Sequence, residues 1–137
     1  MKNKTTFLPL FAAVILLGTA LTACGSKSIV LEGTSWKAIE INGEPTLEDY
    51  AITMDFTVDQ IGGKASCNSY FASYTLKGDK LSIGPAGTTL MACLDQAAMN
   101  QEHLFLTSLD KVETVSLENG QLVLHLGDGG SILLIQQ

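Results

Sequence analysis

The chain has 137 residues with eight lysines, no arginine and fourteen acidic residues, so its formal net charge is −6. This balance argues against nucleic acid as a partner and against electrostatic adhesion to anionic lipid, since both need clustered cationic side chains. The absence of arginine also argues against a phosphoryl-transfer or nucleotide site, because arginine is the residue that clamps phosphate with two parallel hydrogen bonds.

Residues 1–23 have the pattern of a secretory signal. Two lysines precede an apolar run over residues 7–20, and this run is shorter than the about 20 residues that span a bilayer. The chain then reads Leu-Thr-Ala-Cys up to Cys24, which resembles the bacterial lipobox. We therefore predict cleavage before Cys24 and lipidation of its thiol. An ordinary cleaved signal and an uncleaved anchor are the alternatives.

Lipidation at Cys24 predicts where the protein works. Several acyl chains, at about 0.8 kcal/mol per buried methylene, make an effectively permanent anchor. We expect a protein held at the membrane of the cell envelope through lipid at Cys24, facing away from the cytoplasm. If the cell has an outer membrane, we expect it there, since Gly25 is not the aspartate that commonly retains lipoproteins at the inner membrane. Residues 24–32 form a short tether, and ten extended residues reach only about 35 Å.

The rest of the chain is expected to form one acidic domain, over residues 33–137. Removing residues 1–23 from 137 leaves 114, which is enough for a single modest core. These 114 residues keep six lysines against fourteen acidic residues, a net charge of −8. We interpret this acidity as a solubility feature.

Alternating apolar and polar residues predict about eight short strands. The clearest is residues 52–58, whereas residues 35–41 carry apolar groups on both faces and cannot be oriented. Asn-Gly and Gly-Asp pairs indicate tight hairpin turns between several strands. The hairpin over residues 72–83 is expected to bury Tyr74, Leu76, Leu81 and Ile83. The predicted strands are residues 35–41, 52–58, 60–66, 72–77, 80–83, 113–117, 121–126 and 132–136.

One helix is predicted near residues 95–110. From Asp95, a plausible cap, mostly apolar residues recur every three or four positions through to Val112, and Glu102 lies among them. A single late helix and many short strands favour a mainly β fold, a small antiparallel β-barrel with the helix packed against it. Closure into a barrel removes the exposed edges of a flat sheet.

Two cysteines remain once Cys24 carries lipid. An even number in an oxidising envelope favours a disulfide bond between Cys67 and Cys93. The bond would close a ring of 27 residues and stabilise the fold by about 3–4 kcal/mol in the chain-entropy model. Two buried free thiols are one alternative. A metal or redox site is another, although the chain has no Cys-x-x-Cys and neither histidine has ligand spacing from a cysteine.

A Gly-Gly step at residues 62–63 precedes this cysteine pair. Glycine in a strand permits a bulge or the close approach of another backbone. A phosphate-binding loop is disfavoured, because neither a helical pattern nor a Lys-Ser/Thr pair follows.

Four segments together resemble a known family. They are residues 31–36, the Cys-Asn-Ser-Tyr run at 67–70, the Thr-Leu-Met-Ala-Cys run at 89–93 and the helix over 102–109, and they are similar to the META domain family, also called HslJ-like, of bacterial envelope lipoproteins. The resemblance implies a small antiparallel barrel of lipocalin-like topology and no established reaction. The family commonly carries glycine at the positions of Ser66 and Ala72, so the backbone around Cys67 is where this chain is expected to differ.

The motif residues Trp36, Asn68, Tyr70, Thr89 and Met91 are interpreted as structural. The amide of Asn68 can cap backbone groups in a sharp turn, and reading a ligand is the alternative. We expect Trp36, Tyr70 and Met91 to serve as core and lid packing rather than as a binding cage.

No residue pattern specifies a reaction, so we predict a protein that is not an enzyme, with no catalytic, cofactor or metal site. The serines beside Cys67 lack a nucleophile-elbow setting, and there is no His-Glu-x-x-His motif or acid pair. We interpret His103 and His125 as surface or structural histidines. Spatial convergence of Asp55, Asp59 and either histidine stays open.

Two functions follow from these features. The first is a non-catalytic lipoprotein that presents an acidic, disulfide-stapled module to envelope protein partners during stress. The second is a carrier or sensor of a small apolar ligand, which needs a dry cavity of about 300 Å³ or more inside the barrel. We prefer the first, because Phe105, Leu106 and Leu109 on the helix are suited to closing the barrel.

Overall fold

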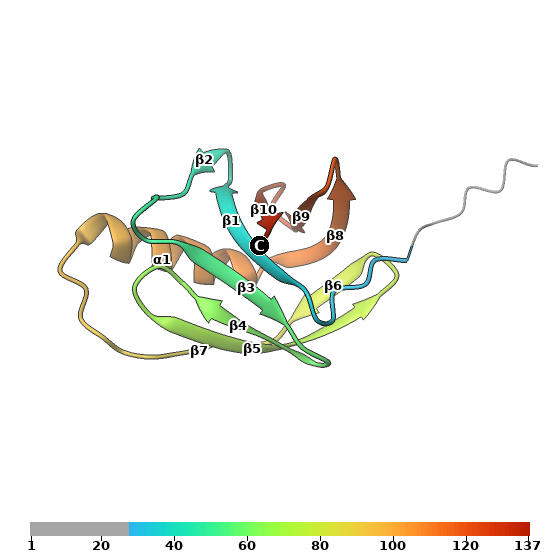
Figure 1. The fold of residues 1–137 in the computed structure, drawn as a ribbon, viewed down its shortest axis with the longest axis horizontal. Helices are drawn as coiled ribbons and strands as arrows, with labels where there is room; N and C mark the ends of the chain where they lie inside the picture. The colour runs from blue at the N-terminus through green and yellow to red at the C-terminus, as the bar shows by residue number, and fades with distance from the viewer. Residues whose placement is uncertain (1–27) are drawn as a thin grey trace, which may run out of the picture.

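A closed antiparallel barrel makes up most of the computed structural model, which describes residues 28–137 (Figure 1). The predicted signal at 1–23 and Cys24 lie outside these residues. The barrel strands follow the order β10, β9, β8, β6, β5, β4, β3, β1, and pairing of β1 with β10 closes the ring. They are β1 (Ser35–Ile41), β3 (Ile52–Phe56), β4 (Gln60–Lys64), β5 (Ser69–Lys77), β6 (Lys80–Ile83), β8 (Val112–Glu118), β9 (Gln121–Leu126) and β10 (Ser131–Gln136).

Three smaller elements complete the fold. Strand β2 (Glu44–Pro45) pairs with β1, and β7 (Gly87–Thr88) pairs with β5. The single helix of the described chain, α1 (Gln96–Leu109), lies between β7 and β8. The prediction of a small antiparallel barrel with one helix is therefore confirmed. Within residues 28–137, no helix is long and apolar enough to cross a membrane.

Strand β3 shows how alternating residues give the barrel an apolar inside and a polar outside. Ile52, Met54 and Phe56 are buried, while Asp55 between them is exposed. Extending this strand to Val58 was wrong: β3 ends at Phe56, because Thr57 turns back to hydrogen-bond the carbonyl of Gln60 at 2.8 Å. Val58 is 75% exposed as a result.

Strand β1 could not be oriented from its sequence because it contains a bulge. Trp36 and Ala38 point inward, the register against β10 shifts between Ala38 and Glu40, and Ile41 then points inward. One extra residue changes which alternate positions face the core. Both faces of the run therefore carry apolar residues.

The β5–β6 hairpin buries the face predicted for it. Tyr74 and Leu81 are buried, and Leu76 and Ile83 are partly buried against the core. Strand β5 begins at Ser69, earlier than the predicted Ala72.

Helix α1 begins where the sequence predicts. The carboxylate of Asp95 accepts hydrogen bonds from the N–H groups of Ala97 at 2.7 Å and Ala98 at 3.3 Å, as an N-cap residue should. The helix ends at Leu109, before Val112, which already belongs to β8.

One cluster of buried apolar side chains fills the barrel and includes residues of α1. Burial of such side chains contributes about 1.5–3 kcal/mol each relative to exposure. The largest fully buried members are Phe105, Leu31, Ile41, Ile52, Met54, Ile61, Leu81, Leu109, Leu122, Leu124, Ile132 and Leu134.

Candidate functional site

A disulfide bond joins two loops at one side of α1. Cys67 lies in the turn between β4 and β5, and Cys93 lies in the loop that leads from β7 into α1. Their Cα atoms are 6.2 Å apart, and the two residues are 26 positions apart in sequence. The predicted pairing is present in the structure. It ties the loop before the helix to the turn between the strands.

Glu102 of α1 holds the same turn from the helix side. Its Oε2 accepts hydrogen bonds from the backbone N–H groups of Cys67 at 3.0 Å and Asn68 at 2.6 Å. Its Oε1 accepts a third from Asn68 Nδ2 at 2.8 Å. Hydrogen bonds to an ionised carboxylate are about twice as strong as neutral ones. One side chain thus orients both the backbone and the amide of this turn.

The role of Glu102 was not predicted, although its position in the sequence carries a signal for one. Glu102 shares the three-and-four spacing of Ala98 and Phe105, which are both fully buried. A carboxylate at such a position must meet hydrogen-bond donors, because burying a charge without partners is costly.

Asn68 uses the hydrogen-bonding capacity of its amide within the protein. Its Oδ1 accepts from the N–H of Met91 and from Thr89 Oγ1, both at 2.8 Å. Its Nδ2 donates to Glu102 and, at 3.4 Å, to the carbonyl of Met91. Thr89 Oγ1 also accepts from the N–H of Ser69 at 3.1 Å. Since an amide offers two donors and one acceptor oxygen with two lone pairs, a ligand would have to displace one of these partners.

We call Cys67, Asn68, Thr89, Cys93 and Glu102 the clasp. Its members come from the β4–β5 turn, the loop after β7 and α1. The clasp fixes the path of the chain between the barrel and the helix by hydrogen bonds and one covalent bond. Its geometry favours the structural interpretation of the Cys-Asn motif.

Trp36 and Tyr70 pack in the core. The Tyr70 hydroxyl donates to the carbonyl of Thr53 at 3.0 Å, and its ring lies edge-on to Phe105 with centroids 5.1 Å apart. Burial raises the pKa of the Tyr70 hydroxyl far above its ordinary value, and the negative charge of Asp55 adds to this shift. Trp36 is buried, with its indole N–H hydrogen-bonded inside the domain.

The backbone near the clasp is unusual at two positions. Gly63 has φ +155°, and a Cβ there would lie 2.4 Å from the carbonyl oxygen of Thr53. The predicted close approach of another backbone at the Gly-Gly step is therefore confirmed. Ser66 has φ +122°, a conformation that glycine adopts freely and side chains rarely do. The Ser66 hydroxyl accepts a hydrogen bond from Gln101 Nε2 at 3.1 Å.

Met91 does not pack in the core, so that part of the predicted core and lid packing is wrong for this residue. The backbone N–H and C=O of Met91 are turned toward Asn68, and its side chain is 57% exposed. We call residues 89–94 the apolar loop, because Leu90 and Leu94 are also almost fully exposed. Met99, in the first turns of α1, is half exposed. Met91 and Met99 both line a hollow of about 230 Å³ between the loop and the helix.

His125 contacts two polar side chains on the outer surface of β8 and β9. Its Nε2 lies 2.8 Å from Ser116 Oγ and 3.8 Å from a carboxylate oxygen of Glu118, and Ser116 Oγ donates to that same oxygen at 2.6 Å. In a catalytic triad the carboxylate hydrogen-bonds one ring nitrogen of the histidine and the serine hydroxyl hydrogen-bonds the other. Here both partners lie at Nε2, so the carboxylate does not orient the ring for a serine.

Across residues 28–137, no three His, Cys, Asp or Glu side chains gather as metal ligands. Asp55, Asp59 and a histidine, whose convergence the sequence left open, form no such group in this part of the chain.

Comparison with known proteins gives one family and two solved structures. The family model described as META domain matches residues 29–137. An NMR structure of a protein from Burkholderia xenovorans has a TM-score of 0.65 and 26% identity, and the alignment covers 78% of this chain and 83% of that one. A second NMR structure has a TM-score of 0.62 and 19% identity, with 77% and 90% covered, and its likeness concerns the fold alone. No curated protein matches the chain.

Proposed function

Since the chain belongs to the META domain family, we propose that it is a non-catalytic, lipid-anchored envelope protein whose small barrel binds protein partners during envelope stress. The observation that carries this proposal is the apolar loop. The clasp holds in place a loop whose large apolar side chains are exposed to solvent.

The apolar loop exposes two leucines and a methionine within five residues. Leu90 is 95% exposed, and Leu94, further along the loop, is fully exposed. Contiguous exposed apolar side chains mark interaction surfaces. Met91 and Met99 add flexible thioethers, which adapt to different apolar partner surfaces. Because the clasp already orders the backbone, the loop would lose little conformational entropy on binding a partner.

The position of the loop suits presentation away from a membrane. The described chain begins at Ser28 and Ile29, which lie beside Asp79 of the β5–β6 turn. The apolar loop lies at the opposite end of the domain, where the chain passes from β7 to α1 (Figure 1). Lipid on Cys24 would hold the first end near the bilayer and leave the loop facing outward.

A filled interior speaks against the carrier alternative. A bound apolar ligand would need a cavity of about 300 Å³ or more inside the barrel. Buried side chains from both the strands and α1 occupy that space as one cluster. A ligand cavity could form inside the barrel only if core side chains such as Leu81 or Leu124, which are almost fully buried, were removed.

Site-specific photo-crosslinking in intact cells tests the proposal. A photoreactive residue in place of Leu94 should give discrete protein adducts in the membrane fraction, more strongly after heat. The matched control is the same residue in place of Val58, another exposed apolar position, far from the apolar loop in sequence and outside it. Changing Leu90 and Met91 to serine should abolish the adducts. Cys24→Ser should remove labelling by a lipid precursor and change the electrophoretic mobility, because the signal is then neither lipidated nor cleaved before residue 24.

The proposal fails if position 94 gives no adduct with or without heat. It also fails if position 58 gives the same adducts, because the contact would then be nonspecific.

A further inference from the structure

The barrel has one weakly closed seam, between β6 and β8. These strands share a single paired position, Lys80 with Thr114, whereas β8 and β9 pair along most of their length. The N–H of Val115 also donates to the carbonyl of Asp79 at 2.8 Å, at the same end. Beyond Lys80, residues 81–83 of β6 have no strand partner on the β8 side.

The backbone groups of Ile83 point into this seam. Gly84 donates its N–H to the carbonyl of Ser73 in β5 at 2.8 Å. Hydrogen-bonded and non-hydrogen-bonded pairs alternate along an antiparallel ladder, and Ile83 pairs with Tyr74 one position earlier. The N–H and C=O of Ile83 are therefore directed away from β5, toward β8.

A bulge in β8 opens the seam. The register against β9 runs from Val112 with Leu126 to Thr114 with His125, so Glu113 is the extra residue. Bulges bend the strand that contains them. Gly127 makes room for the displaced side chain, since a Cβ there would lie 2.5 Å from a carboxylate oxygen of Glu113.

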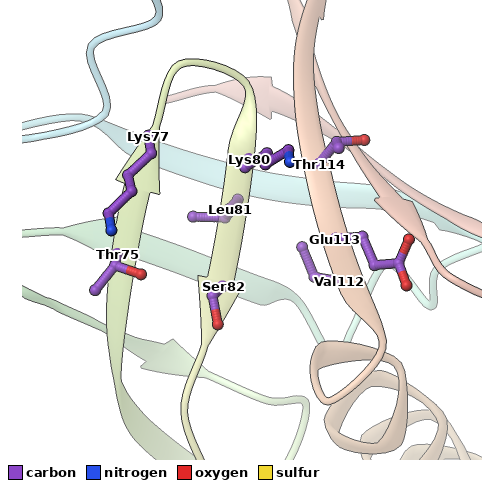
Figure 2. Close-up of a pocket in the computed structure, with 8 residues that line it drawn as sticks. All are labelled: Thr75, Lys77, Lys80, Leu81, Ser82, Val112, Glu113 and Thr114. Carbon is purple, nitrogen blue, oxygen red and sulfur yellow. The ribbon is translucent and has the colours of Figure 1, made fainter.

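The separation leaves a groove of about 470 Å³ on the outer surface (Figure 2). Leu81 and Val112 form its floor, which is almost buried. Ser82 lies on the β6 side and Glu113 on the β8 side. The volume falls within the range of about 300–1,000 Å³ that ligand sites occupy.

On an acidic domain, the groove carries two lysines against one acidic side chain, Glu113. Lys77 and Lys80 line it, and they are two of the five lysines in residues 28–137. Among these described residues, the one lysine within 4.0 Å of a carboxylate is Lys111, beside Asp128, so neither groove lysine forms an ion pair. Lys80 lies on β6 at the paired end of the seam and Lys77 on the neighbouring β5 (Figure 2), and their ammonium groups favour an incoming carboxylate.

We propose that this groove binds an extended segment of a partner protein, which adds a strand to the free edge of β6 and places an acidic side chain beside Lys77 and Lys80. The inference rests on the proposed function and names the chemistry of the partner segment. In strand addition, main-chain hydrogen bonds supply affinity and alternate side chains supply specificity.

The register of β6 defines the segment. Lys80 and Ser82 point outward, whereas Leu81 points inward. A strand laid beside them therefore has acidic side chains at its outward positions and small apolar ones at its inward positions. The segment alternates acidic and apolar residues.

The test uses the purified domain and a capped peptide, acetyl-Glu-Val-Glu-Val-Glu-amide, followed by NMR. Saturable amide shifts should map to residues 81–83 and Thr114, and exchange of the Ile83 amide should slow in the complex. The double charge reversal K77E/K80E should weaken binding at least about tenfold. The control K37E/K64E has the same net charge and changes lysines outside the groove, so it should bind normally.

Other outcomes overturn the inference. Equal weakening by both double variants would make the attraction a general charge effect. Glutarate that binds as tightly as the peptide would make the groove a small-anion site. Shifts confined to other residues, or an unchanged Ile83 exchange rate, would remove strand addition. Because the crosslinking test is made at Leu94, the proposed function can stand while this inference fails.

Discussion

Replacing Glu102 by glutamine should loosen the clasp while keeping the size of the side chain. In the native domain the carboxylate accepts two backbone N–H groups, of Cys67 and Asn68, and the Asn68 amide N–H. Glutamine has one oxygen, which can accept the two backbone groups. Its NH₂ would then face Asn68 Nδ2, donor against donor. Asn68 cannot turn its amide over without giving up Met91 and Thr89.

The magnitude follows from these contacts. A hydrogen bond to a charged group contributes about 1.5–3 kcal/mol, and a buried donor left without an acceptor costs about 1–3 kcal/mol. Glu102→Gln loses one charge-assisted bond outright and weakens two. We expect a loss of about 2–3 kcal/mol in the free energy of unfolding, which lowers Tm by about 10 °C in a domain of this size.

Thermal and urea unfolding with the disulfide kept oxidised measure this loss. Glu48→Gln is the matched control, because Glu48 is exposed and outside the clasp. Hydrogen exchange should also speed up at the amides of Cys67 and Asn68 in the Glu102 variant alone. A Glu102→Gln domain within about 0.5 kcal/mol of the parent, the range of an ordinary surface change, would refute the reasoning.

Three further changes test other parts of the structure. Ser66→Gly should stabilise the domain by about 0.5 kcal/mol in urea unfolding, because relief of backbone strain of about 1–3 kcal/mol slightly exceeds the added freedom of the unfolded chain together with the lost hydrogen bond from Gln101; a destabilised variant would contradict this. Tyr70 has a folded pKa raised by burial, so its contribution is complete below the unfolded value of about 10 and declines above it. Stability should therefore fall above that pH, and less steeply in Tyr70→Phe; equal slopes would be the contrary result. The hydrogen bond from Lys111 lowers the pKa of Asp128. The ionised Asp128 therefore stabilises the fold above the pKa that this carboxyl has in the unfolded chain, and this stabilisation is lost as the pH falls through its pKa in the folded domain. Lys111→Met should raise the Asp128 pKa in an NMR titration, and an unmoved titration would exclude this cause.

Features that depend on neighbouring residues could be predicted. The cap at Asp95 needs only the two N–H groups that follow it, and the buried face of the β5–β6 hairpin follows from alternation around one turn. Predictions were wrong where apolar and polar residues went on alternating beyond the end of a strand. Val58 continues the alternation of β3, but the chain has already turned.

The orientation of β1 could not be predicted, because of its bulge. Alternation assumes a constant register, and the shift between Ala38 and Glu40 breaks it. Only the partner strand β10 reveals where the extra residue lies, because a bulge is a property of a pair of strands.

Taken by itself, the sequence determined the fold class, the single capped helix and the cysteine pair, because alternation, capping and cysteine number act over short distances or need only a count. Tertiary structure alone decided that Glu102 lies under a turn 34 residues earlier, that Met91 turns outward, and that β6 and β8 part beyond Lys80. Each of these depends on which distant segments come into contact once the barrel closes, and local sequence patterns do not determine those contacts.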